Sequence, residues 1–383
     1  MEQIKTRRTP LYATHQKLGA HLVEFGGWEM PLCYTSIIEE HQAVRAAAGI
    51  FDVSHMGEVS IRGAGALEFL NGVLTNDARK LRPGQGQYTL MCNPRGGVVD
   101  DLYLYQEEGG DFLLVVNASR VEADVAWLEG WRAEFARRSQ VELANRTGEL
   151  AAVAVQGPMA RGFIDNCFSR GARAASALKK NEAARLDFAG RKVLVSCTGY
   201  TGEDGFEVVA PAEVIEAIWN RVLEAGGPFG VKPAGLGARD TLRTEACYPL
   251  YGHELDEETT PLEAGLGYFV ALGKGDFVGR SVLAEQKAKG VSRMLAAFKM
   301  AGRSAPARPG YPIWSAPAGN GPVGRVSSGT QSPSLGVGIG MGYVPPEYAV
   351  ANTTVGIEIR GKQIPATVVP RPIYRAGRMG GSS

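Results

Sequence analysis

Two adjacent carboxylates, Asp100 and Asp101, are the first candidates for chemistry in this chain. They follow Gly96-Gly97-Val98-Val99, where the glycine pair predicts a turn and the valines begin a strand. Because successive side chains of a strand point to opposite faces, only one of the two carboxylates can point inward. Burying a carboxylate is costly unless donors surround it. The inward aspartate therefore either serves acid–base or electrostatic chemistry, or stabilises a turn.

A second polar segment, Gly199-Tyr200-Thr201-Gly202-Glu203-Asp204-Gly205-Phe206-Glu207, is dense in glycine. Asp204-Gly205 is a strong hairpin signal, and Glu207 then lies on the outgoing strand between apolar residues. Glu207 is either a solvent-facing acid or a carboxylate that accepts N–H donors of a heterocycle. Tyr200 is in turn either an aromatic wall of such a site or a structural tyrosine.

Two arginines stand four residues apart in Gly235-Leu236-Gly237-Ala238-Arg239-Asp240-Thr241-Leu242-Arg243. This run predicts a loop that enters a short helix, and the spacing places Arg239 and Arg243 on one helical face. Two guanidinium groups together suit a carboxylate or a phosphate. The alternative is that they form ion pairs with Asp240, with Glu245 or with the acids over 254–258.

His55, in Phe51-Asp52-Val53-Ser54-His55-Met56, is a tempting general base, but no nucleophile motif such as G-x-S-x-G accompanies it. The histidines form no H-E-x-x-H set, and none of the five cysteines forms a C-x-x-C pair, so we predict no metal site and reduced, mostly buried thiols. We find no G-x-G-x-x-G after a strand and no G-x-x-x-x-G-K-[ST], which argues against a nucleotide cofactor.

The elements that must position these residues follow from hydrophobic periodicity. Predicted strands over 101–105 and 112–116 precede a helix from about Ser119, where Ser119 and Glu122 match a capping box. Predicted strands over 192–197 and 206–209 precede a helical face from Val214 to Ala225. A hairpin followed by a helix, found twice, predicts an α+β fold with antiparallel sheet.

The last hundred residues have a different character. After about residue 290, β-like runs over 294–298, 355–359 and 366–369 alternate with turns rich in Gly, Pro and Ser. This pattern predicts a separate small barrel or sandwich.

Length and charge limit the class of protein. The chain has 383 residues, which predicts two or three domains. Its 41 basic and 40 acidic residues give a net charge of +1, which argues against binding to nucleic acid through phosphate neutralisation. No apolar run approaches the roughly 20 residues of a membrane span, and the first residues have no apolar signal segment. We therefore expect a cytoplasmic protein.

These motifs together resemble the T protein (aminomethyltransferase) family of the glycine cleavage system. Phe25-Gly26-Gly27-Trp28-Glu29-Met30-Pro31-Leu32 and the His55 segment are similar to its amino-terminal motifs. The Asp100 segment is similar to its catalytic-aspartate motif, and the Tyr200 and Arg239 segments to two further signatures. Ser328-Gly329-Thr330-Gln331-Ser332-Pro333-Ser334-Leu335-Gly336 is similar to the carboxy-terminal one. The motifs stand in the family's order from about residue 9 to about residue 375.

The resemblance implies a three-lobed arrangement with tetrahydrofolate in a central channel. We accordingly expect a folate-binding catalytic region over residues 1–289, with two intertwined α+β subdomains and boundaries near 50 and 150, and a C-terminal β-barrel domain over 290–383. The resemblance also implies the reaction. A lipoyl carrier protein (H protein) presents an aminomethyl group on sulfur, and the enzyme transfers the carbon to tetrahydrofolate and releases ammonia. No metal or nucleotide is needed.

The resemblance assigns roles residue by residue. Asp100 matches the catalytic aspartate, and Glu207 and Arg239 match positions that bind the pterin and the rest of the folate. Tyr88 and Tyr200 match aromatic positions that line the channel. A carboxy-terminal arginine also serves in some members, and Arg371, Arg375 and Arg378 compete for that role.

Three alternatives to this assignment remain. A tetrahydrofolate-dependent demethylase of a small methylated compound would share the folate pocket. A folate-binding protein tied to iron–sulfur assembly would carry a Lys-Gly-Cys-Tyr-x-Gly-Gln-Glu motif, which is missing here, with Cys247-Tyr248 as the nearest match. An interaction module without chemistry would not need so many polar motifs at glycine turns.

Overall fold

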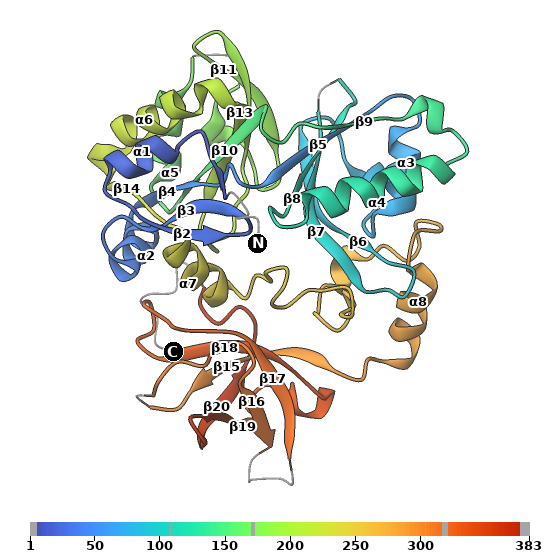
Figure 1. Cartoon of the computed structure of the whole chain (residues 1–383), viewed down its shortest axis with the longest axis vertical. Coiled ribbons are helices and arrows are strands. Elements are labelled where there is room, and N and C mark those ends of the chain that lie inside the picture. Colours follow the sequence, from blue (N-terminus) through green and yellow to red (C-terminus); the bar gives the residue numbers. More distant parts are fainter. Residues whose placement is uncertain (1–5, 108, 170–172, 303, 316–320, 376–383) are drawn as a thin grey trace. The chain divides into compact units, whose positions relative to one another are not determined.

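The structure, a computed structural model, describes residues 6–107, 109–169, 173–302, 304–315 and 321–375. The chain forms two compact units. The first comprises Met1–Val73, Asp77–Thr89 and Leu102–Arg239, and the second comprises Leu74–Asn76, Leu90–Asp101 and Asp240–Ser383. Figure 1 labels the helices and strands along the chain.

A six-stranded sheet forms one half of the first unit. Its order is β11-β12-β13-β10-β4-β14, and its pairs are antiparallel except for β14 and β4. The strands are β4 (Ala48–Asp52), β10 (Leu150–Gln156), β11 (Ala183–Phe188), β12 (Arg191–Ser196), β13 (Gly205–Pro211) and β14 (Val231–Pro233). The hairpin predicted from residues 192–197 and 206–209 is thus confirmed as β12 and β13.

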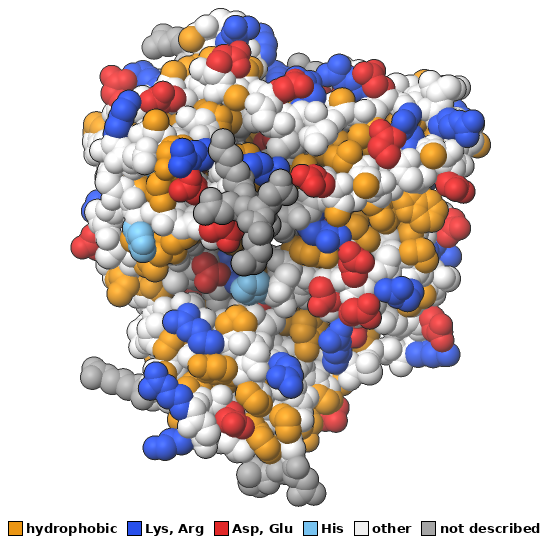
Figure 2. All heavy atoms as spheres, in the orientation of Figure 1, with side chains coloured by type: hydrophobic (Ala, Val, Ile, Leu, Met, Phe, Trp, Pro, Cys, Tyr) orange, Lys and Arg blue, Asp and Glu red, His pale blue; other side chains and the backbone are white. Residues whose placement is uncertain are grey.

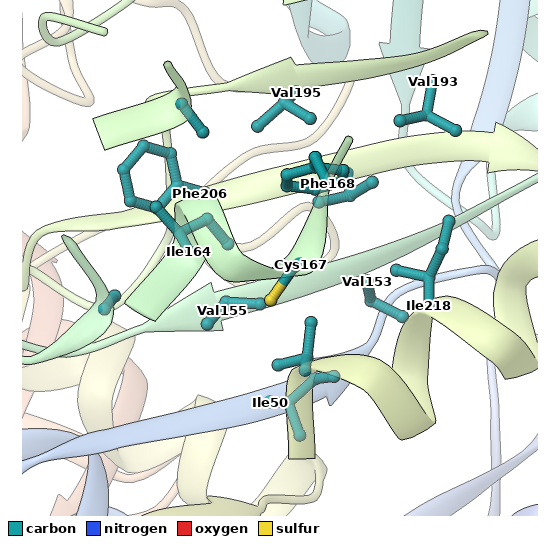
Figure 3. Packing of buried hydrophobic residues seen from close by; sticks show 14 of the residues in the cluster. Ile50, Val153, Val155, Ile164, Cys167, Phe168, Val193, Val195, Phe206 and Ile218 are labelled. Carbon is teal, nitrogen blue, oxygen red and sulfur yellow. The ribbon is translucent and has the colours of Figure 1, made fainter. Parts of the chain in front are cut away.

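The core of this half lies between the sheet and helix α6 (Ile215–Gly226). Figure 3 shows Ile50, Val153 and Val155 from the sheet beside Ile218 from α6, with Cys167 among them. Short helix α5 (Ala160–Phe163) adds Phe163 to the same cluster. Because α6 buries its face at Ile215, Ile218, Trp219 and Val222, the helical periodicity read from residue 214 onward is confirmed.

A five-stranded sheet, β6-β7-β8-β5-β9, forms the other half, except that residues 90–92 of β6 and 98–101 of β7 belong to the second unit. Its strands are β5 (Gly57–Arg62), β6 (Gln85–Cys92), β7 (Val98–Gln106), β8 (Phe112–Val116) and β9 (Glu142–Asn145), and its helices are α3 (Ala66–Val73) and α4 (Val121–Glu134). The capping box expected at Ser119 and Glu122 does not form. Helix α4 begins two residues later, with Arg120 at its N-cap and no side-chain cap bond.

Strand β5 carries a buried carboxylate. Glu58 has 0% exposed surface, and neither of its carboxylate oxygens has a hydrogen-bond partner among the described residues. Burial raises the pKa of Glu58 to about 8. Glu58 is therefore a neutral acid at physiological pH, because the ionised form cannot be solvated there.

Glu58→Gln is expected to reduce the loss of unfolding free energy that the wild type shows as pH rises. Since the folded-state pKa is raised, the contribution to stability is complete below the unfolded value of about 4.3 and is lost as pH rises toward 8. The wild type should lose roughly 3 kcal/mol from this group between pH 5 and pH 8. Urea unfolding at both pH values checks this. An equal change of the unfolding free energy between pH 5 and pH 8 in variant and wild type would contradict it.

The amino-terminal segment packs onto the six-stranded half of the first unit. It forms the sheet β1-β3-β2 and two helices. These elements are β1 (Arg7–Arg8), α1 (Tyr12–Lys17), β2 (His21–Phe25), β3 (Trp28–Cys33) and α2 (Ile37–Ala46). A buried polar chain holds them: His15 Nε2 lies 2.9 Å from Asp52 Oδ2, and Tyr34 Oη lies 2.9 Å from His15 Nδ1. Thr9 Oγ1 and the Ser54 N–H also donate to Asp52.

Asp52→Asn is expected to destabilise the protein by about 3 kcal/mol at pH 7, because it removes one partner from a fully buried pair. Burial, the largest single influence, raises the pKa of Asp52, but hydrogen bonds from His15, Ser54 and Thr9 together hold it below its usual value. The stability from this group is therefore present above about pH 3.9 and lost as pH falls further. Chemical unfolding at several pH values below 5 measures this loss. If the unfolding free energy of the variant fell with pH as steeply as that of the wild type, the argument would be refuted.

The second unit holds the closed barrel predicted for the last hundred residues. Its strand order is β15-β18-β17-β16-β19-β20. The strands are β15 (Met294–Met300), β16 (Pro312–Ser315), β17 (Pro322–Gln331), β18 (Gly338–Val344), β19 (Thr354–Ile359) and β20 (Lys362–Val369), and helix α8 (Arg280–Lys289) precedes them. The predicted mixed class, with helices and antiparallel sheet followed by an all-β barrel, is confirmed.

Short 3-10 turns connect these elements. They are Ala78–Lys80, Arg138–Gln140, Ile164–Cys167, Ala175–Ala177, Ala212–Val214, Gly227–Phe229, Gly267–Phe269 and Pro346–Tyr348. Helix α7 (Leu236–Ala246) carries the chain from the first unit into the second. On the face drawn in Figure 2, basic and acidic side chains are interspersed, in keeping with the net charge of +1.

Candidate functional site

Glu207 lies on β13 in the first unit, opposite Ala154 of β10 and Ser196 of β12. Its side chain is half-buried rather than fully exposed. One carboxylate oxygen, Oε2, accepts a hydrogen bond of 2.7 Å from Thr198 Oγ1. The carboxylate is thus held in place and is not a freely solvated surface acid.

Tyr105 joins this carboxylate through hydroxyl groups. Its phenol lies 3.1 Å from Ser196 Oγ and 3.1 Å from Thr198 Oγ1, and those two hydroxyls are 2.8 Å apart. Burial, followed by the negative charge of Glu207, raises the pKa of Tyr105 well above its usual value, so the phenol stays protonated. Sequence reasoning missed Tyr105, because only side-chain contact between two sheets brings it to residues some 90 positions away.

Arg239 is the cation of the same region. Its guanidinium carbon lies 4.7 Å from the centre of the Tyr200 ring, a cation–π distance. Its Nη1 is buried and has no hydrogen-bond partner among the described residues. Burial lowers the pKa of Arg239, and the charges of Glu207 and Tyr200 oppose that effect. A buried N–H donor without a partner is costly and suits an oxygen acceptor from a ligand.

Arg243 has a different environment, and the two arginines do not form a joint anion site. In the second unit Arg243 donates to Asp240 at 2.7 Å, to Glu254 at 2.9 Å and to Ser328 Oγ at 2.8 Å. The ion-pair alternative considered for this spacing is therefore correct for Arg243. Arg239 is the arginine with an unused donor.

The glycine-rich loop before Glu207 is held by Gln156, which has 0% exposed surface. Its Nε2 donates to the Thr198 carbonyl at 3.0 Å, and its Oε1 accepts from Thr201 Oγ1 at 2.9 Å. A Cβ at Gly199 would lie 1.8 Å from Gln156 Oε1, so a larger residue there would displace the Gln156 side chain. Gln156 thereby positions Tyr200; a lone glutamine in an apolar strand gives no sequence signal for this role.

His55 and Tyr88 also belong to the first unit. His55 has 3% exposed surface, and its Nδ1 has no hydrogen-bond partner among the described residues. Burial is the main cause that lowers the pKa of His55 to about 4, with a smaller contribution from the charge of Arg239. A neutral histidine of this kind is a weak base near pH 7. Tyr88 is half-buried on β6.

The aspartate pair lies on the part of β7 that belongs to the second unit. Asp100 has 0% exposed surface, whereas Asp101 is half-buried. Strand alternation places Asp100 on the face of Leu102 and Leu104, and places Asp101 on the opposite face. The expectation that only one of the two carboxylates points into the core is confirmed.

The glycine turn before these aspartates is tightly packed. A Cβ at Gly97 would lie 1.8 Å from the Glu257 carbonyl oxygen, and Asn93 Nδ2 donates to the same carbonyl at 2.9 Å. The Val98 N–H donates to the carbonyls of Asp256 and Thr259. The start of β7 is therefore fixed by the segment over 256–259.

The three carboxy-terminal arginines differ in position. Arg371 is half-buried and donates through Nη1 to the Ala264 carbonyl at 2.9 Å. Arg375 is exposed. Arg378 lies outside the described residues.

Within the described residues, no group of three or more His, Cys, Asp or Glu side chains could hold a metal ion. All five cysteines are free thiols; Cys33 is half-buried and the others are buried. In the same part of the chain, every helix is too short or too polar to cross a membrane.

Known proteins resemble this chain over almost its whole length. The GCVT N-terminal domain model matches residues 11–274, and the glycine cleavage T-protein C-terminal barrel domain model matches residues 293–375. A protein named aminomethyltransferase from Desulfitobacterium hafniense (strain DSM 10664 / DCB-2) is 46% identical over 377 residues, which is 96% of this chain and 98% of the relative. An aminomethyltransferase from Geobacillus kaustophilus (strain HTA426) is 47% identical over 373 residues, with 97% and 100% covered.

A solved structure gives the same result. The crystal structure of glycine cleavage system aminomethyltransferase T from Bartonella henselae superposes with a TM-score of 0.88 at 34% sequence identity, and covers 97% of this chain and 99% of its own. The chain therefore belongs to the glycine cleavage T-protein family of aminomethyltransferases, which are tetrahydrofolate-dependent one-carbon transferases.

Proposed function

We propose that this enzyme binds tetrahydrofolate through the first unit and takes the one-carbon group from an aminomethyl-loaded lipoyl carrier protein, the H protein. The observation that carries the folate site is Arg239, whose buried Nη1 has no acceptor among the described residues while its guanidinium lies against Tyr200. A folate offers a ring with N–H donors at one edge and a carbonyl oxygen, and the Glu207–Arg239 pair offers the complementary acceptor and donor.

The other predicted folate residues stay part of this proposal. Tyr200 and Tyr88 would supply aromatic walls for the pterin and benzoyl rings. The exposed Arg375, or Arg378, would meet the negatively charged glutamate tail of the folate. No metal and no nucleotide enter the reaction.

The chemistry requires a carboxylate near the reacting carbon. The S–C and C–N bonds of the aminomethyl group break, two C–N bonds to folate nitrogens form, and the two folate N–H protons go to the sulfur and to the departing ammonia. The carbon passes as an iminium-like cation, which an anion stabilises. The sequence prediction for that anion is Asp100. Asp100 has no exposed surface in this structure whereas its neighbour Asp101 is half-buried, so we place the role on Asp101.

The proposal is tested by following methylenetetrahydrofolate and ammonia together, with tetrahydrofolate and aminomethyl-loaded lipoyl carrier protein as substrates. Equal amounts of both products are expected. A reaction without the carrier protein, and one with a small methylated sulfonium or methoxy compound in its place, are the controls. Turnover only with the methylated compound would replace the proposal with the demethylase alternative.

We also propose that the protein works in the cytoplasm, as its composition suggests, and that residues 1–289 form the catalytic region and 290–383 the barrel domain. The two family models, which match residues 11–274 and 293–375, support that division. Fractionation of cells that express the tagged chain tests the location.

A further inference from the structure

Three buried hydroxyl groups lie behind the Glu207 carboxylate. Tyr105 has 2% exposed surface, Ser196 has 2% and Thr198 has 8%. Each hydroxyl is within 3.1 Å of the other two, and Thr198 alone bonds a carboxylate oxygen of Glu207. The Ser196 hydroxyl also lies 3.4 Å from the Glu207 main-chain carbonyl.

The carboxylate sets the direction of these hydrogen bonds. An ionised carboxylate can only accept, so the single proton of Thr198 must point to Glu207 Oε2. Thr198 can then only accept from Ser196 or Tyr105. The order Tyr105 to Ser196 to Thr198 to Glu207 satisfies every hydroxyl, and each bond in such a chain strengthens the next.

The three hydroxyls come from two sheets of the same unit and from the loop after one of them. Tyr105 lies on β7 of the five-stranded sheet, whereas Ser196 is the last residue of β12 in the six-stranded sheet and Thr198 lies in the loop that follows it. Tyr105 therefore supports the Glu207 carboxylate indirectly, through the hydroxyl groups of Ser196 and Thr198, from a different sheet. A carboxylate that accepts two N–H groups from a flat ring must lie in the plane of that ring. The hydrogen bond from the Thr198 hydroxyl to Glu207 Oε2 restrains the carboxylate in one plane.

We propose that Tyr105, Ser196 and Thr198 are positioning residues for the folate reaction: they fix the plane of the Glu207 carboxylate so that its remaining lone pairs accept the N–H groups of the pterin ring. This inference rests on the proposed function of Glu207. It adds three residues that do not themselves touch the substrate.

The test measures the Kd for tetrahydrofolate by calorimetry, and kcat and KM in the coupled assay. Thr198→Val keeps the shape and removes the hydroxyl, and is expected to weaken binding about tenfold, the effect of losing one hydrogen bond to a charged group. Tyr105→Phe is expected to weaken it about threefold, since Ser196 still supports Thr198. Both variants should raise KM and leave kcat nearly unchanged, because binding rather than the chemical step is altered.

Two variants separate this role from general packing. Thr198→Ser keeps the hydroxyl and should bind as the wild type does. Tyr103→Phe changes the neighbouring tyrosine of β7, whose hydroxyl donates to Asn181, and should also bind normally.

Variants of Glu207 and of the hydroxyl residues distinguish the positioning role from the proposed folate site. If Glu207→Gln loses binding while Thr198→Val and Tyr105→Phe bind as the wild type, the positioning role is wrong and the folate site stands. If Thr198→Ser binds as poorly as Thr198→Val, packing and not the hydroxyl matters, and the inference is overturned. If Glu207→Gln binds normally, the folate site itself is wrong.

Discussion

Asp101→Asn is expected to lower kcat by roughly 10²–10⁴-fold and to leave the Kd for tetrahydrofolate nearly unchanged. Asparagine has the same shape but no negative charge, so it removes the stabilisation of the iminium-like carbon without removing a ring contact. Single-turnover formation of methylenetetrahydrofolate, measured beside calorimetric folate binding, separates the two effects.

Asp100→Asn is the matched control for this experiment. Asp100 is fully buried on the face of β7 that carries Leu102 and Leu104. Its substitution should lower the unfolding free energy and leave kcat of the folded enzyme within a few-fold of the wild type. A collapse of kcat in Asp100→Asn, with Asp101→Asn nearly active, would return the catalytic role to Asp100.

Glu207→Gln is expected to raise the Kd for tetrahydrofolate by roughly 10–100-fold, the effect of replacing an ionised acceptor by a neutral one in a partly buried site. The amide also presents an N–H toward a ring edge that offers N–H groups, so the loss exceeds that of a single bond. Calorimetric titration measures it.

Glu213→Gln provides the control for that titration. Glu213 is a solvent-exposed acid of the same unit, and it forms an exposed ion pair with Arg191 at 3.7 Å. Its substitution should leave folate binding unchanged. Similar affinities for the Glu207 and Glu213 variants would remove Glu207 from the site.

The Arg239 side of the pair allows an independent check of the same idea. The guanidinium lies on Tyr200 and keeps one buried N–H without an acceptor among the described residues. The negative charge of Glu207 raises the pKa of Arg239 and so opposes the effect of burial. The two side chains therefore interact electrostatically. Loss of either partner should weaken the same ligand.

Local patterns in the sequence were sufficient for the elements and for the family. The Gly-rich segment and the flanking apolar residues predicted β12 and β13, although Gly205 is the first residue of β13 and not part of a two-residue turn. Alternation predicted that one carboxylate of the aspartate pair would be buried. These features depend on residues close together in the chain, where spacing alone fixes the outcome. The ordered set of motifs likewise predicted the T-protein family, which the comparisons confirm.

Only the tertiary structure decided which side chains work together. Arg239 and Arg243 are equivalent by spacing, but partners from distant segments neutralise Arg243 and leave Arg239 with an unused donor. Tyr105 reaches Thr198 across two sheets, and Gln156 holds the Gly199 loop, through contacts between residues that are 40 to 90 positions apart. Packing between sheets and between a strand and a distant loop creates these neighbours, and no local periodicity records it, because burial and charge at one residue depend on what the rest of the fold brings beside it.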